Sequence, residues 1–284
     1  MPLPPALSRS AAVAVAAPAS APLTPADLRA GLAALRARGL RVEMPAEAAM
    51  LADDFAPHGY LAAPDAARLA ELNGLLRRDD LDALFVVRGG YGVLRLLPGL
   101  SGPMVAPDWP HLDAESEAQF WRLAEGHAPV AITGPGGEAL EAVRPGRAEG
   151  VLLGGNLTML ASLLGTPYLP DLHGAILYLE EVGEPPYRVD RLLAQLRLAG
   201  VLENLGGLVL GGFTGCEPPQ DRPSLPLDAV LADYTAGLPF PVARGLVYGH
   251  FRRKSTLPFG VRARLEADAG TATLTVLDPV TARG

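Results

Sequence analysis

The chain has little cysteine, few aromatic residues and no block of basic residues, and each shortage excludes a class of protein. Its single cysteine, Cys216, cannot form an intramolecular disulfide, so nothing in the chain requires an oxidising compartment. We expect this lone thiol to be inert. With a net charge of −7 and 6% aromatic residues, the chain lacks the basic face that a nucleic-acid groove needs to neutralise phosphates. We therefore expect no nucleic-acid partner.

Long apolar runs are also missing. No stretch approaches the roughly 20 apolar residues of a membrane-spanning helix, so we expect no membrane partner. The alanine-rich run 11–17 stops at Pro18, and a capped helix follows at the distance typical of a strand-loop-helix unit. This pattern favours a strand over a secretory leader and predicts a cytoplasmic protein.

The chain does have enough apolar residues for a substantial core. Its 284 residues, 49% of them hydrophobic, predict two domains of medium size. In the first half, strand-like and helix-like patterns alternate, which favours a parallel sheet covered by helices. Thr24 can cap a helix that has Pro25 in its first turn and continues to Gly39. Further helices are predicted over 65–77 and 114–125, with strands over 41–44 and 83–87.

The second half begins after a segment rich in glycine and proline. This segment, 134–146, is the predicted linker between an N-terminal domain (1–138) and a C-terminal domain (147–284). Beyond it, the patterns predict helices over 156–164 and 187–198, strands over 175–179, 208–210 and 242–246, and an antiparallel hairpin over 261–276. The predicted fold class is α/β, with a parallel N-terminal sheet and a distinct C-terminal domain of mixed or antiparallel strands.

Two residues stand where ligand sites usually lie in such folds. Glu180 is at the carboxyl end of a predicted buried strand, and His250 follows Gly249 just after another strand. A carboxylate and an imidazole can together remove a proton from a nucleophile. The alternatives are a solvated acid beside Glu181 and a loop histidine bonded to a backbone carbonyl.

Other candidates have equally simple alternatives. Gly89 and Gly90 follow a buried strand; they could form an ordinary tight turn, and they lack the G-x-G-x-x-G spacing of a dinucleotide loop. Asn156 could line a cleft or cap the helix that it begins. The remaining histidines have no metal-ligand spacing, so we expect no metal and no cofactor; they are His58, His111, His127 and His173.

Several motifs occur together in a recognisable order. They are Arg88-Gly-Gly-Tyr-Gly92, Gly154-Gly-Asn-Leu157, Leu179-Glu-Glu181 with Pro186-Tyr-Arg188, and Gly249-His250 with Leu257-Pro258. In this order the chain resembles the LD-carboxypeptidase family of serine peptidases, which includes the microcin C self-immunity enzymes. The resemblance extends from about Ala11 to the C-terminal hairpin.

The resemblance implies a Ser-Glu-His mechanism. Glu180 would be the acid and His250 the base, while the amides near Gly89 and Gly90 would form an oxyanion hole and Asn156 would line the cleft. The implied activity is release of terminal D-alanine from cytoplasmic murein tetrapeptides during peptidoglycan recycling, by a protein that forms homodimers. Microcin-type hydrolysis of an aminoacyl nucleotide is an alternative, but two Trp and seven Tyr in the chain favour a peptide over a stacking base.

The expected serine is missing. The family places a strand, the nucleophile turn and a helix where Leu100 passes directly to Ser101-Gly-Pro103, and such a block takes roughly 30 residues. Ser101 is the nearest substitute, but it lies downstream of the missing block and lacks a strained turn. The gap could reflect omitted residues, a deletion that leaves a catalytically inactive muropeptide-binding protein, or a faulty gene sequence. A Cα separation near 3.8 Å between Leu100 and Ser101 would exclude omitted residues.

Overall fold

The computed structural model describes residues 3–51, 58–100, 113–133, 137, 139–221, 223–250 and 253–282. Ser101 and His111 lie outside these ranges, as does the Leu100–Ser101 separation. The contacts divide the chain into two compact units. Unit 1 comprises Met1–Leu112 with Thr281–Gly284, and unit 2 comprises Asp113–Val280.

Unit 1 is built on a parallel sheet of three strands in the order β2-β1-β3. The strands are β1 (Ala12–Ala16), β2 (Arg41–Glu43) and β3 (Ala83–Val86), and the helices are α1 (Pro25–Ala37), α2 (Ala46–Met50) and α3 (Asp65–Leu76), with a 3-10 turn η1 (Leu97–Gly99). Thr24 caps α1 as predicted, since its Oγ1 accepts the Asp27 amide at 3.1 Å. Leu72 and Leu75 of α3 pack on Ala14 and Ala16 of β1, which fixes this helix on the sheet.

Unit 2 contains an eight-stranded mixed sheet in the order β4-β11-β10-β6-β7-β8-β9-β5. Its strands are β4 (Val130–Ile132), β5 (Glu141–Arg144), β6 (Gly146–Asn156), β7 (Ile176–Val182), β8 (Gly207–Thr214), β9 (Val242–Arg244), β10 (Val261–Ala267) and β11 (Ala272–Val276). Its helices are α4 (Ala114–Ala124), α5 (Leu157–Ala161), α6 (Pro186–Leu198) and α7 (Leu227–Thr235), with a 3-10 turn η2 (Leu202–Asn204). Strands β6 to β9 run parallel, and the predicted C-terminal hairpin pairs antiparallel.

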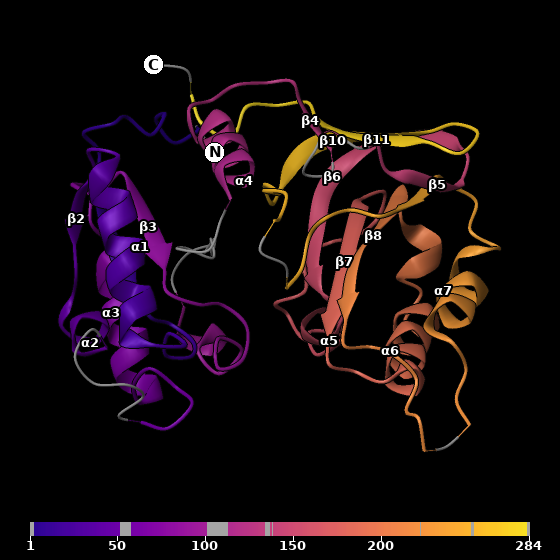
Figure 1. The fold of residues 1–284 in the computed structure, drawn as a ribbon, viewed down its shortest axis with the longest axis horizontal. Coiled ribbons are helices and arrows are strands. Elements are labelled where there is room, and N and C mark those ends of the chain that lie inside the picture. Colours follow the sequence, from indigo (N-terminus) through magenta and orange to yellow (C-terminus); the bar gives the residue numbers. More distant parts are fainter. Residues whose placement is uncertain are drawn as a thin grey trace. The chain divides into compact units, whose positions relative to one another are not determined.

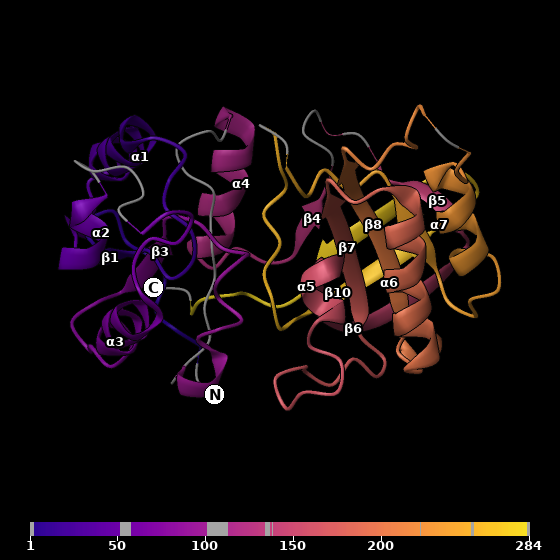
Figure 2. The same cartoon turned by 90° about the horizontal axis from the view of Figure 1, so that it is seen from below.

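The parallel strands of unit 2 have a core on each face. Leu177 and Leu179 of β7 pack in one core with α5, α6 and α7, which lie along this face in Figures 1 and 2. Ile176 and Tyr178 face the other way and pack against residues of the β10–β11 hairpin. This alternation is what a strand buried on both faces produces. The α/β fold class predicted from the sequence is confirmed in both units.

Strand β5 lies inside the predicted linker and pairs with β9, and strand β6 was not predicted as a strand. The packing explains the glycines of β6: a β-carbon at position 154 would lie 1.9 Å from the Tyr178 carbonyl oxygen, and one at 150 would lie 2.2 Å from that of Gly174. Helix α4 was expected to close the N-terminal domain, whereas its contacts place it in unit 2. No helix in the described ranges combines the length and apolar character needed to cross a membrane.

Candidate active site

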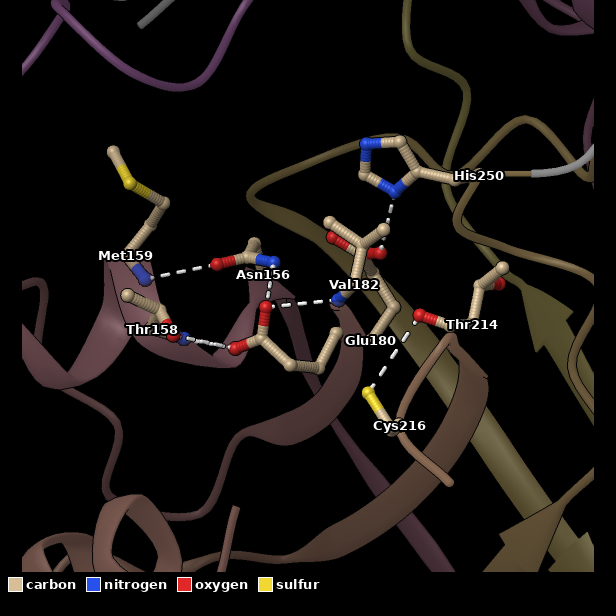
Figure 3. A network of polar contacts seen from close by, with 9 residues as sticks. Asn156, Thr158, Met159, Glu180, Val182, Thr214, Cys216 and His250 are labelled. Atoms are coloured by element: carbon tan, nitrogen blue, oxygen red, sulfur yellow. Dashed lines mark hydrogen bonds and ion pairs between the residues drawn. The ribbon is translucent and has the colours of Figure 1, made fainter. Parts of the chain in front are cut away.

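The structure brings Glu180 and His250 together. The His250 Nδ1 atom lies 3.2 Å from Glu180 Oε2, although the two residues are 70 positions apart in the sequence (Figure 3). The Glu180 side chain is 7% exposed and that of His250 is 54% exposed. A buried carboxylate therefore holds one nitrogen of an accessible imidazole and turns the other, Nε2, away from itself. This is the arrangement in which an acid orients a general base.

An irregularity in the sheet gives Glu180 its position. Glu180 lies near the carboxyl end of β7, where Leu179 pairs with Leu210 and Glu181 pairs with Phe213. Two residues of β8, Gly211 and Gly212, therefore stand opposite the single residue Glu180. Such bulges are common beside active sites because they redirect a side chain.

Glycines allow the His250 segment to approach this bulge. A β-carbon at position 211 would lie 2.7 Å from the Tyr248 carbonyl oxygen, and the Gly212 amide donates to that same oxygen at 2.9 Å. Gly249 has a φ of +136°, a conformation that glycine tolerates far better than other residues. The backbone around Gly249 thus determines where the imidazole of His250 stands.

Two tyrosines with raised pKa values lie close in sequence to this pair. The rings of Tyr178 and Tyr248 meet edge to face with centroids 4.9 Å apart, and each tyrosine stands two residues before a member of the pair. Burial, followed by the nearby Glu180 charge, raises the pKa of Tyr248 to about 12. Burial also raises the pKa of Tyr178 well above its usual value. Both phenols are neutral near pH 7.

Glu181 has a structural role that differs from the role of Glu180. It is buried, and its carboxylate accepts hydrogen bonds from Asn156 Nδ2 (2.8 Å), from the Thr158 amide (2.8 Å) and hydroxyl (2.6 Å), and from the Val182 amide (2.9 Å). Its neighbour Asn156 caps α5 through Oδ1, which accepts the Met159 amide at 3.0 Å (Figure 3). The capping alternative for Asn156 is therefore present in the structure, and its role in lining a cleft stays a prediction.

The glycine-rich turn lies in unit 1, just after β3. Gly89 and Gly90 are exposed, and Gly90 (φ +89°) and Gly92 (φ +100°) both take left-handed conformations. The Val93 amide donates to the Gly90 carbonyl at 3.2 Å and closes the turn. The turn follows the carboxyl end of a parallel strand, where ligands bind in many α/β proteins. Its service as an oxyanion hole remains a prediction.

Most of the described serines use their hydroxyl groups in hydrogen bonds within the protein. The Oγ atoms of Ser162, Ser224 and Ser255 donate to the carbonyls of Thr158, Leu225 and Thr133, respectively. Ser116 Oγ donates to Asp113 and accepts the Lys254 amide. Ser20 Oγ is buried and, within the described residues, has no hydrogen-bond partner. The sequence signalled none of these as a nucleophile, and their contacts give no reason to change that view.

Within the described ranges, the other reactive side chains form no second site of this kind. Cys216 is buried, and burial raises the pKa of its thiol, which keeps it protonated at neutral pH. His58, His127 and His173 are exposed. Among the described residues, no three His, Cys, Asp or Glu side chains gather where they could hold a metal ion.

Comparisons with known proteins match both halves of the chain. Family models of the LD-carboxypeptidase N-terminal domain and C-terminal domain match residues 13–110 and 149–265. The murein tetrapeptide carboxypeptidase of Pseudomonas aeruginosa is 34% identical, with 75% of this chain and 81% of that protein covered. A carboxypeptidase-like protein of Streptomyces coelicolor is 38% identical, with 94% of each chain covered.

Solved structures have the same fold. The crystal structure of a muramoyltetrapeptide carboxypeptidase from Oxalobacter formigenes is 29% identical with a TM-score of 0.79, covering 94% of this chain and 99% of that one. An MccF-like protein from Bacillus anthracis has a TM-score of 0.81 at 18% identity, covering 98% and 100%, and this likeness shows the fold alone.

Proposed function

The chain belongs to the LD-carboxypeptidase family, and on that basis we propose that it is a serine carboxypeptidase releasing terminal D-alanine from murein tetrapeptides. The observation that carries the proposal is the 3.2 Å contact between Glu180 and His250. A buried acid that orients an exposed imidazole is the part of a hydrolase triad that can be recognised from geometry.

In the proposed reaction, His250 is the general base. Its Nε2 takes the proton of a serine hydroxyl as the oxygen attacks the amide carbonyl, and Glu180 stabilises the imidazolium that forms. The amides near Gly89 and Gly90 bind the oxyanion. The imidazolium then gives its proton to the leaving D-alanine amine. A water molecule, deprotonated by the same imidazole, hydrolyses the acyl-enzyme and restores the serine.

The proposed reaction needs a serine nucleophile, and the block that carries it in the family is missing from this sequence. The alignment with the Streptomyces coelicolor relative covers 304 positions although this chain has 284 residues, so at least 20 aligned positions lack a counterpart here. This accords with a missing block of roughly 30 residues at the Leu100–Ser101 junction. In addition, β3 ends the described sheet of unit 1 on one side, where a further strand could pair.

The missing block also favours a second candidate function. A chain that keeps the acid and base but lacks the nucleophile turn would bind a muropeptide without cleaving it, because a Glu-His pair with an oxyanion hole retains only residual catalysis. The microcin-type alternative has less support. The microcin C7 self-immunity protein of Escherichia coli is 29% identical but matches over only 46% of this chain.

One set of measurements distinguishes these functions. The intact mass of the protein establishes whether residues are missing between Leu100 and Ser101, and incubation with murein tetrapeptide tests for released D-alanine. We expect release that His250→Ala abolishes and that His173→Ala, which changes an exposed loop histidine, leaves intact. If folded protein binds the tetrapeptide in calorimetry but releases nothing, the carboxypeptidase proposal is wrong and the binding function replaces it.

Two further parts of the proposal concern the protein in the cell. We propose a cytoplasmic location, where recycled murein peptides would be its substrates, and a homodimeric state. Light scattering of the purified protein tests the second point, since a single mass of 29.6 kDa would contradict a homodimer.

A further inference from the structure

Arg68 of α3 is a fully buried cation that the proposed chemistry does not use. Its side chain is 0% exposed, whereas its counter-ion Asp65 is 37% exposed. Arginine is almost never fully buried unless it is paired, because moving a charge out of water is costly. The single ion pair with the partly exposed Asp65 does not account for the complete burial of Arg68.

The guanidinium of Arg68 joins three loops. Its Nε donates to the Ala63 carbonyl at 2.9 Å, and its Nη1 donates to the carbonyls of Pro18 and Gly92, the latter at 3.2 Å. Pro18 follows β1, Ala63 precedes α3, and Gly92 belongs to the glycine-rich turn after β3. The planar guanidinium, whose donors are fixed and spread over three nitrogen atoms, suits three acceptors that come from different directions.

Main-chain and side-chain contacts reinforce this junction. The Ala62 amide donates to the Ala19 carbonyl, and the Ala21 amide donates to that of Tyr60. A β-carbon at Gly92 would lie 2.5 Å from Leu61 Cδ2 and 3.3 Å from Arg68 Nη1. The glycine-rich turn is therefore packed directly onto the guanidinium and onto the loop that carries Leu61.

Asp65, which is partly exposed, forms ion pairs with both Arg68 and Arg95. Arg68 Nη2 binds Asp65 Oδ1 at 2.5 Å, and Arg95, just beyond the turn, binds Asp65 Oδ2 at 2.7 Å. The hydrogen bond from Arg95 is the main cause that lowers the pKa of Asp65, which therefore stays ionised at neutral pH. Two cations share one carboxylate, so this network leaves a net positive charge beside the turn.

We propose that Arg68 is the positioning residue that holds the Gly89–Gly92 turn ready to bind an oxyanion. The inference rests on the proposed function for its catalytic meaning, but the positioning itself can be measured without turnover. Amides that already point at a developing negative charge need no reorganisation during the reaction, and a displacement of about 1 Å can cost roughly a hundredfold in rate. A buried cation behind the turn also favours negative charge in front of it.

Two variants and one control test the proposal. Arg68→Met removes the charge and all donors, while Arg68→Lys keeps the charge but loses the fork. Asn73→Ala is the matched control, because Asn73 lies on the same helix and donates to the Gly99 carbonyl at 2.7 Å, away from the three loops. Thermal unfolding identifies the variants that fold.

The first readout is independent of activity. In folded variants we expect amide hydrogen exchange at Val93, whose amide donates to the Gly90 carbonyl and closes the turn, to be at least tenfold faster than in the parent protein or in Asn73→Ala. We also expect loss of the cross-relaxation signal between the rings of Tyr60 and Tyr91, whose centroids are 5.3 Å apart. If both substitutions prevent folding, the test is the exchange of the Arg68 Nε proton with solvent in the parent protein. Slow exchange is expected for a buried proton that is hydrogen-bonded to the Ala63 carbonyl, and rapid exchange overturns the proposal.

The second readout is D-alanine release. We expect kcat to fall about tenfold to a hundredfold in Arg68→Met with KM changed less than twofold, and Arg68→Lys to recover only part of the loss. Unchanged exchange at Val93, or a loosened turn with unchanged kcat, overturns the inference. If the parent protein releases no D-alanine, the proposed function fails, and the exchange rates still decide whether Arg68 positions the turn.

Discussion

Gly249 packs so closely against Glu180 that a β-carbon at position 249 would lie 3.2 Å from Glu180 Oε2. That oxygen is the one that holds His250. The glycine before the imidazole is therefore part of what places the acid and the base in contact.

Replacing this glycine should separate the pair. In Gly249→Ala, a methyl group crowds Glu180 Oε2 while the backbone is held at φ +136°, so we expect a loss of about 1–3 kcal/mol in the free energy of unfolding. The downfield proton resonance of His250 Nδ1–H should disappear. Gly270→Ala is the control, since position 270 also has a positive φ (+91°) but no atom within 4 Å of its β-carbon. A retained resonance in Gly249→Ala would show that the pair tolerates the methyl group.

Removing the charge of Glu180 should affect catalysis more than stability. Glu180→Gln keeps the shape of the side chain but no longer stabilises an imidazolium, so we expect D-alanine release to fall about 10³- to 10⁴-fold in kcat. Chemical denaturation should show a change of less than about 1.5 kcal/mol. A variant that is folded and fully active would exclude Glu180 as the acid.

The adjacent substitution should give the opposite result. Glu181→Gln places an amide NH2 among four donors from Asn156, Thr158 and Val182, so at least one of them loses its acceptor. We expect the free energy of unfolding to fall by about 2–4 kcal/mol. The His250 Nδ1–H resonance should persist. Denaturation curves and one-dimensional proton spectra of the two variants, recorded side by side, test this contrast.

Alkaline pH should destabilise the protein through Tyr248. Its pKa is raised to about 12 in the folded state, against about 10 in the unfolded chain, so the folded state holds the phenolic proton more tightly. The resulting contribution, about 2–3 kcal/mol, is complete below pH 10 and is lost as the pH rises from 10 to 12. Urea unfolding across this range should show a shallower decline for Tyr248→Phe than for Tyr168→Phe, which removes an exposed hydroxyl. Parallel declines would contradict the assignment.

Helix α4 should restrain the segment that follows His250. Ser116 Oγ accepts the Lys254 amide at 3.0 Å, and Gln119 Oε1 accepts the Thr256 amide at 2.6 Å. In the double variant Ser116→Ala, Gln119→Ala, we expect these two amides to exchange with solvent at least tenfold faster, with a loss of about 1–3 kcal/mol in stability. Thr235→Ala, which deletes a buried hydroxyl within α7, is the control. Unchanged exchange would mean that other contacts hold this segment.

Local patterns in the sequence were enough to predict most elements. The Thr24 cap, the leucine periodicity of α1 and the alternation of the β10–β11 hairpin all depend on residues close together in the chain, and each forms as predicted. The family motifs pointed to Glu180 and His250, which the fold brings within hydrogen-bond distance. Strand β6 escaped prediction because its glycines are required by neighbouring strands that lie far away in the sequence.

The supporting residues could not be identified from the sequence. Glu181 differs from Glu180 only in the strand face from which it projects and in the bulge that shifts the register beside it. Ser116 and Gln119 bind amides that lie 138 and 137 positions away. Arg68 left one weak signal, a charged residue among the apolar positions of α3. Such a residue is usually solvated, so its burial became evident only from the three loops that surround it.

By itself, the sequence determined the α/β class, the positions of most helices and strands, the family, and the absence of the expected serine block between Leu100 and Ser101. These follow from periodicity, capping and motif order, which are properties of neighbouring residues. Only the tertiary structure decided that Glu180 contacts His250 while Glu181 is bound by Asn156 and Thr158, and that a buried Arg68 binds the glycine turn. Both depend on strand register and loop packing, which arise from contacts between distant parts of the chain.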